Sequence, residues 1–94
     1  MKVLLTGGSG LLGKQIISID EDIICPSRED LDITNSTRCD EWINSSVDLV
    51  IHAAALTSPP VCDKRPAEAR ETNILGTLNV INSCSKSNVR LVYI

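Results

Sequence analysis

The feature that most constrains this chain is a glycine-rich segment directly after a short apolar run. Residues 2–6 read KVLLT, a continuous apolar stretch typical of a strand that is covered on both faces. The segment GGSGLLG follows at residues 7–13, and apolar residues at helical spacing come next. A strand, a glycine-rich turn and an amphipathic helix in this order are the context that a dinucleotide-binding turn requires.

The glycines satisfy two spacings of such a turn at once, because Gly8-x-Gly10-x-x-Gly13 overlaps the wider Gly7-x-x-Gly10-x-x-Gly13. One glycine permits the sharp bend, the next removes the Cβ that would block a diphosphate, and the last allows close helix–strand packing. Unpaired N–H groups at the start of the helix would face the diphosphate. A merely tight turn is the alternative interpretation, whereas no Gly-Lys-Ser/Thr follows at the distance of a phosphate-binding loop. We therefore expect an NAD-type cofactor to bind at Gly7, Gly10, Leu11, Leu12 and Gly13.

Strands and helices alternate along the rest of the chain. Further strands are predicted at residues 23–25, 31–33, 48–52 and 90–94. This alternation implies right-handed βαβ units and a parallel sheet. The expected fold is α/β: one Rossmann-type, doubly wound NAD(P)-binding domain over residues 1–94, incomplete, with about five strands on the order 3-2-1-4-5-6.

Two helices are predicted between these strands in addition to the one after the glycine turn. Asn35 or Ser36 can cap a helix that runs through Trp42 and Ile43. Pro66 is placed as the first-turn proline of a longer helix that reaches about Ser85. Its apolar spacing predicts a buried stripe with the following members: Ile74, Leu78 and Ile81, flanked by Leu75 and Cys84.

Composition excludes several classes of partner. The net charge is −3 without a cluster of Lys and Arg, so we expect no nucleic-acid binding. The four cysteines are widely separated and there is one histidine, so we expect no metal site. The cysteines are interpreted as small apolar residues. No apolar run has the length of a membrane span and no signal peptide is recognised, so we expect a cytoplasmic protein and no membrane binding.

The residues after the second predicted strand bear on the choice of cofactor. Many dinucleotide-binding folds carry an acidic residue here that binds the ribose 2′-hydroxyl. This chain has Cys25-Pro26-Ser27-Arg28 instead. The hydroxyl of Ser27 and the guanidinium of Arg28 suit a 2′-phosphate, which favours NADP(H) and leaves NAD(H) as an option. Arg28 as a solvated loop residue is the alternative interpretation.

Segments in a characteristic order then resemble a known family. They are Thr6–Gly13 (TGGSGLLG), Arg28–Thr34 (REDLDIT), Val50–Thr57 (VIHAAALT) and Glu71–Asn79 (ETNILGTLN). Together they resemble the extended short-chain dehydrogenase/reductases. The Leu-Asp-Ile-Thr segment close behind an arginine is most similar to the dTDP-4-dehydrorhamnose reductases.

The resemblance implies roles for further residues. Asp32 and Ile33 are expected to meet the adenine, although Asp32 on its own chemistry could equally cap a turn. The small residues Ala53, Ala54 and Ala55 would let the diphosphate and ribose lie close to the end of the fourth predicted strand.

Three polar residues complete the expected site and its surroundings. Thr57 would reach toward the nicotinamide side. Asn73 resembles the family's helix asparagine, which supports the active site, and its poor helix propensity indicates a special role. His52 is interpreted as a packed or hydrogen-bonded residue rather than a base.

The implied function is that of an NADP(H)-dependent reductase of a dTDP-4-keto-6-deoxysugar in dTDP-rhamnose biosynthesis. The family's Tyr-x-x-x-Lys pair and its nucleotide-sugar site do not occur within residues 1–94, and Tyr93 is not that tyrosine. We therefore expect no catalytic residue in this chain and no activity from it alone, and we expect residues 90–94 to self-associate as an edge strand. The alternatives are a fragment of an NAD-dependent nucleotide-sugar epimerase or dehydratase, and a non-catalytic nucleotide-binding regulatory subunit.

Overall fold

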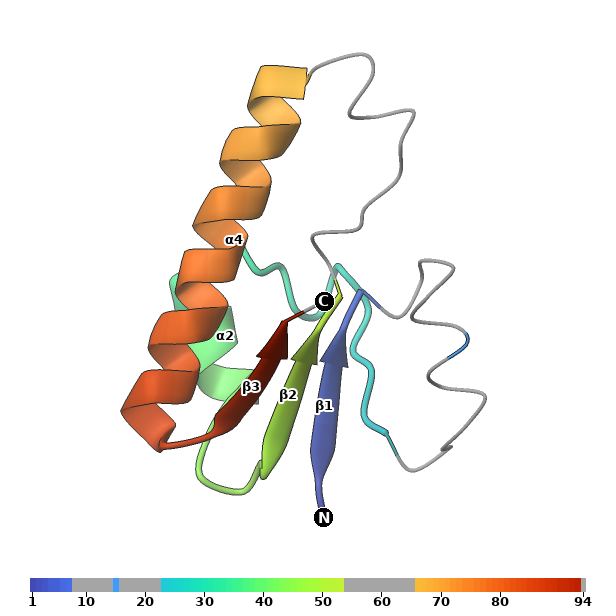
Figure 1. Cartoon of the computed structure of the whole chain (residues 1–94), viewed down its shortest axis with the longest axis vertical. Coiled ribbons are helices and arrows are strands. Elements are labelled where there is room, and N and C mark those ends of the chain that lie inside the picture. Colours follow the sequence, from blue (N-terminus) through green and yellow to red (C-terminus); the bar gives the residue numbers. More distant parts are fainter. Residues whose placement is uncertain (8–14, 16–22, 54–65, 94) are drawn as a thin grey trace.

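The computed structural model describes residues 1–7, 15, 23–53 and 66–93. Within them, three parallel strands form one sheet in the order β1 (Val3–Thr6), β2 (Leu49–His52) and β3 (Arg90–Tyr93). Two helices, α2 (Ser36–Trp42) and α4 (Pro66–Ser87), contact each other beside this sheet (Figure 1). The parallel α/β architecture expected from the sequence is confirmed for this part of the chain.

The strand predicted at residues 23–25 is reduced to a single bridge. Ile24 pairs in parallel with Leu4, on the side of β1 that faces away from β2. The amide of Leu5 donates to the Ile24 carbonyl at 2.8 Å, and the Ile24 amide donates to the Val3 carbonyl at 2.9 Å. The resulting order, Ile24, β1, β2, β3, is the central part of the predicted Rossmann-type sheet.

The prediction of a strand at residues 31–33 is wrong, because this segment forms a turn that ends at Thr34. Asp32 stabilises the turn: its Oδ1 accepts hydrogen bonds from the Thr34 amide at 3.0 Å and the Thr34 hydroxyl at 2.6 Å. The Asp32 carbonyl also accepts from the Asn35 amide at 2.9 Å. An aspartate that bonds the backbone two residues later favours a turn over an extended strand. The interpretation of Asp32 as a turn-capping residue is thereby confirmed.

The predicted capping of α2 is confirmed. Asn35 has extended backbone angles, and its side chain accepts a hydrogen bond from the amide of Arg38. This bond satisfies one of the N–H groups that the first turn of a helix leaves unpaired. The predicted start of α4 at Pro66 is also confirmed.

The predicted buried stripe of α4 is wrong for most of its members. Ile74, Leu78 and Ile81 are 55%, 51% and 43% exposed, and Leu75 is exposed with them. Only Cys84 of the predicted set is buried. The buried face of α4 instead carries the following residues: Gly76, Asn79, Val80, Ser83 and Cys84.

The side chains on this buried face explain why the spacing of apolar residues predicted the wrong face of α4. Ser83 donates to Asp40 of α2 at 2.7 Å, and Ser87 donates to the carbonyl of Ile43 at 3.3 Å. Small side chains allow α4 to approach α2 closely, and their polar atoms are satisfied across the contact, so their burial carries little cost. The helix then ends where Asn88 adopts a φ of 55° and the Val89 amide bonds the Cys84 carbonyl at 2.9 Å.

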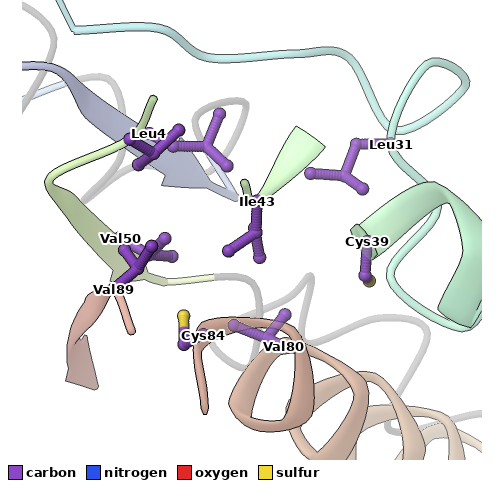
Figure 2. Packing of buried hydrophobic residues seen from close by; sticks show 9 residues of the cluster. Leu4, Leu31, Cys39, Ile43, Val50, Val80, Cys84 and Val89 are labelled. Carbon is purple, nitrogen blue, oxygen red and sulfur yellow. The ribbon is translucent and has the colours of Figure 1, made fainter. Parts of the chain in front are cut away.

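The hydrophobic core lies between the sheet and the two helices, as Figure 2 shows. The sheet contributes Leu4 and Val50, which are in register neighbours on β1 and β2. Val80 and Cys84 come from α4, and Leu31 and further residues of the α2 region close the cluster. The core therefore fixes the turn at residues 31–34 as well as the strands, which matters for the site described next.

Candidate functional site

The candidate site lies at the carboxyl ends of the parallel strands, which meet at one edge of the sheet (Figure 1). Gly7 follows β1 directly and has a φ of 83°, a backbone conformation that residues with a Cβ rarely adopt. Gly7 is the glycine that is expected to begin the cofactor turn. Open α/β sheets bind their ligands in the crevice at this edge.

The end of β2 lies directly beside the end of β1. The amide of Ala53 donates to the Thr6 carbonyl at 3.0 Å, which continues the strand pairing one residue past β2. Ala53 is buried. Gly7 and Ala53 thus place a glycine and an alanine at the ends of neighbouring strands, an arrangement that fits a closely approaching diphosphate.

His52 forms a buried polar network just below this edge. Its Nδ1 lies 2.6 Å from the Thr6 hydroxyl, and its Nε2 lies 2.9 Å from the Thr77 hydroxyl of α4. Burial lowers the pKa of His52, since desolvation disfavours the charged imidazolium. The interpretation of His52 as a hydrogen-bonded, packed residue is confirmed, and the ring joins β1, β2 and α4.

Sequence reasoning missed the two threonine partners of His52. Thr6 precedes the glycine turn and Thr77 follows Gly76, so each lay inside a motif that was interpreted for other reasons. A buried histidine in an apolar strand requires a partner for each ring nitrogen, which was the signal available for finding them. The ring centroid of Tyr93 on β3 lies 5.6 Å from that of His52, so β3 adjoins the same network.

Ser27 and Arg28 are exposed in the segment that follows Ile24. The hydroxyl of Ser27 accepts from the Asp30 amide at 3.1 Å, and its carbonyl accepts from the Leu31 amide at 2.9 Å. Ser27 therefore organises the local turn. Exposed side chains that follow the bridge between Ile24 and β1 are compatible with a 2′-phosphate, and their binding role stays a prediction.

Asp32 lies close behind these residues and is exposed. The hydrogen bond from the Thr34 hydroxyl lowers the pKa of Asp32, with smaller contributions from the Thr34 amide and the positive charge of Arg28. A carboxylate held in this form can accept a hydrogen bond from an exocyclic amine. Ile33, the other residue expected to meet the adenine, is half-buried.

The remaining expected residues are only partly described. Asn73 is half-buried on α4. The other members of the expected cofactor site lie outside the described residues, namely Gly10, Leu11, Leu12, Gly13, Ala54, Ala55 and Thr57. The described part of the site therefore consists of the ends of β1 and β2 and the segment from Ser27 to Ile33.

The described ranges contain no group of three or more His, Cys, Asp or Glu side chains arranged to hold a metal ion. In the part of the chain that the structure describes, no helix combines the length and the apolar character that crossing a membrane demands. Cys25, Cys39 and Cys84 are free thiols.

Comparisons with known proteins agree with this geometry. The family model of the RmlD substrate binding domain matches residues 1–94. The inverting UDP-N-acetylglucosamine 4,6-dehydratase of Campylobacter jejuni is 33% identical and covers 94% of this chain and 34% of its own length. D-erythronate dehydrogenase of Haemophilus influenzae is 29% identical over all of this chain and 36% of its own length.

A solved structure extends the likeness to a cofactor complex. The dTDP-4-dehydrorhamnose reductase of Bacillus anthracis in complex with NADP has a TM-score of 0.81 and 31% identity, covering 99% of this chain and 36% of that chain. The chain spans about a third of the length of the curated relatives it matches. Because the family model covers every residue, the chain belongs to the RmlD substrate binding domain family, among the extended short-chain dehydrogenase/reductases.

Proposed function

We propose that residues 1–94 form the cofactor-binding domain of an NADP(H)-dependent reductase that acts on a dTDP-4-keto-6-deoxysugar. The observation that carries this proposal is the positive φ of Gly7 immediately after β1, beside the buried Ala53 at the end of β2. The 31% identity to a dTDP-4-dehydrorhamnose reductase solved with NADP supports the choice of reaction and cofactor.

Each part of the cofactor has assigned residues in this proposal. The diphosphate lies against Gly7, Gly10 and Gly13, with the amides of Leu11 and Leu12 donating to it. Ala53, Ala54 and Ala55 leave room for the diphosphate and ribose. Asp32 accepts from the adenine amine, and Ile33 beside it completes the pair that meets the adenine. Thr57 reaches toward the nicotinamide side, and Asn73 supports the active site from α4.

The ribose end determines the preference between cofactors. Ser27 and Arg28 are exposed and follow the bridge residue Ile24, where a 2′-phosphate could reach them. A guanidinium presents fixed donors to phosphate oxygens, whereas an acidic residue at this place would repel them. NADP(H) is therefore preferred, and NAD(H) binds more weakly because it lacks the phosphate.

The chemistry requires a hydride and a proton. The reduced nicotinamide ring, when bound, supplies the hydride to the sugar's keto carbon. The residues of this chain bind and orient the cofactor, and His52, neutral and buried, holds the ends of β1 and β2 in place rather than moving a proton. Residues 1–94 contain no Tyr-x-x-x-Lys pair, so the proposal assigns none of them as the proton donor.

An assay with product analysis tests the proposed reaction. The full-length protein is mixed with NADPH and a dTDP-4-keto-6-deoxysugar, and we expect NADPH oxidation together with formation of the dTDP-6-deoxysugar. The 94-residue chain in the same assay is expected to show no turnover above the blank. Absence of NADPH oxidation by the full-length protein would contradict the proposed reaction.

The second candidate is an NAD-dependent nucleotide-sugar epimerase or dehydratase. It is favoured by the 33% identity to the Campylobacter jejuni 4,6-dehydratase. Such an enzyme would convert a nucleotide sugar without net consumption of added cofactor. A regulatory subunit, the third candidate, would bind the cofactor and show neither reaction, so product analysis separates all three.

A further inference from the structure

The turn formed by Asp32, Ile33 and Thr34 is attached to α4 and α2 through Ile33. The carbonyl of Ile33 accepts a hydrogen bond from Asn79 Nδ2 of α4 at 2.9 Å. It also accepts from the thiol of Cys39 on α2 at 3.5 Å. Asn79 and Cys39 are both buried, Ile33 is half-buried, and the two hydrogen bonds are partly buried. One carbonyl thus receives two donors from two different helices.

The side chain of Ile33 is fixed by a second contact on the same helix. A Cβ on Gly76 would lie 2.6 Å from Ile33 Cγ1 and would also collide with its Cδ1. Gly76 sits in the interior of α4, where glycine costs about 1 kcal/mol relative to alanine in helix propensity. Its purpose here is therefore a close approach: the missing side chain provides the space that Ile33 occupies.

The two contacts help to place Asp32. Its Oδ1 accepts from the amide and hydroxyl of Thr34, and its carbonyl accepts from the Asn35 amide. These local bonds fix the shape of the turn, and the burial of Leu31 in the core together with the contacts of Ile33 sets its position. Gly76 and Asn79 are one helical turn apart, so they hold the side chain and the carbonyl of Ile33 from the same helix face.

We infer that Gly76 and Asn79 are positioning residues that set the affinity for the adenosine half of the cofactor by holding Asp32 and Ile33 at the edge of the site. This inference rests on the proposed function, in which Asp32 and Ile33 meet the adenine. Neither Gly76 nor Asn79 has to touch the cofactor. A displacement of Ile33 would move both adenine contacts together, because the turn moves as one unit.

Two variants of the full-length protein test the inference. Asn79→Asp replaces the amide donor with a carboxylate facing a carbonyl, and Gly76→Ala fills the space of Ile33. We expect each to weaken binding of adenosine 2′,5′-bisphosphate about tenfold, the size expected when a buried hydrogen-bond partner is lost. Binding of reduced nicotinamide mononucleotide is expected to change less than about twofold, the level of a remote substitution. Calorimetric titration measures both.

Asn82→Asp is the matched control, because Asn82 is exposed on the same helix and the substitution adds the same charge. It is expected to leave both affinities unchanged. If Asn79→Asp fails to fold, Asn79→Ser removes the amide donor without adding a charge and takes its place. Thermal unfolding of each variant identifies a general loss of structure, which would weaken both ligands equally.

The outcomes separate the inference from the proposed function. The inference would be overturned if Asn79→Asp and Gly76→Ala bound adenosine 2′,5′-bisphosphate as tightly as the wild type does. It would also be overturned if the variants lost equal affinity for adenosine 2′,5′-bisphosphate and reduced nicotinamide mononucleotide. In these cases the wild-type protein still binds NADPH and the proposed function stands. A wild-type protein that binds neither NADPH nor the adenosine fragment would overturn both.

Discussion

Gly76 of α4 and Ile33 of the preceding turn are so close that a Cβ on Gly76 would lie 2.6 Å from Ile33 Cγ1. We expect Gly76→Ala to destabilise the protein by about 1–3 kcal/mol, the usual cost of overpacking, despite the better helix propensity of alanine. Urea denaturation of the variant measures this change in the free energy of unfolding.

A double-mutant cycle identifies Ile33 as the cause. In the Ile33→Ala background only the Cβ of residue 33 remains, at 3.4 Å from the added Cβ, which is an ordinary contact distance. There, Gly76→Ala should be neutral or stabilising by up to about 1 kcal/mol. Equal destabilisation in both backgrounds would show that the collision with Ile33 is not the reason for the glycine.

The buried neutral state of His52 predicts a pH dependence of stability. Its pKa is lowered from 6.5 in the folded chain by burial, so the unfolded state binds the proton more readily. The contribution of His52 to the free energy of unfolding is fully present above pH 6.5. It declines as the pH falls through the lowered pKa of the folded state. The slope is at most about 1.4 kcal/mol per pH unit for one proton.

The chain has one histidine, which makes this dependence assignable. Unfolding free energies measured from pH 7 downward are expected to fall more steeply in the wild type than in His52→Asn, which can hydrogen-bond but does not titrate in this range. Parallel curves for the two proteins would contradict the assignment.

Cys39 provides a test of core packing between α2 and α4. Burial is the main cause that raises the pKa of its thiol to about 11, so about one molecule in a thousand carries the thiolate at pH 8. We expect Cys39 to be alkylated by iodoacetamide far more slowly in the folded protein than in urea, as followed by mass spectrometry of its peptide. Comparable rates in both conditions would show that the helix contact opens readily.

We expect the chain to self-associate through the outer strand β3. Val92 and Tyr93 are 45% and 59% exposed, and β3 is paired on one side by β2 within the described sheet. An exposed apolar edge favours pairing with another chain. We expect light scattering of the 94-residue chain to show concentration-dependent oligomers that Val92→Lys reduces, and a monomer at high concentration would argue against this.

The predictions of β1, β2, β3 and of the two helix starts succeeded, whereas the strand predicted at residues 31–33 did not form. Gly7 at a positive φ, Asn35 at the cap of α2 and Pro66 at the start of α4 each act within a few residues of their own position. The arrangement of β1, β2 and β3 followed from the alternation of strands and helices, which leaves few topologies open.

The buried face of α4 was mispredicted because distant contacts decide it, whereas the strand predicted at residues 31–33 failed because of the local bonds between Asp32 and Thr34. The spacing of Ile74, Leu78 and Ile81 is that of an apolar stripe, yet α4 turns its small and polar residues inward. That choice depends on partners 43 and 46 residues away in the chain, Asp40 for Ser83 and the Ile33 carbonyl for Asn79. Periodicity alone contains no information about such pairs.

The central claim is that this chain binds NADP(H) at the carboxyl edge of its sheet, with the 2′-phosphate at Arg28. Calorimetric titration of the full-length protein with NADPH and NADH, repeated on Arg28→Ala, tests this most directly. We predict tighter binding of NADPH than of NADH, with the difference reduced about tenfold in Arg28→Ala, as for a lost charge-assisted hydrogen bond. Failure of the wild-type protein to bind either cofactor would contradict the claim.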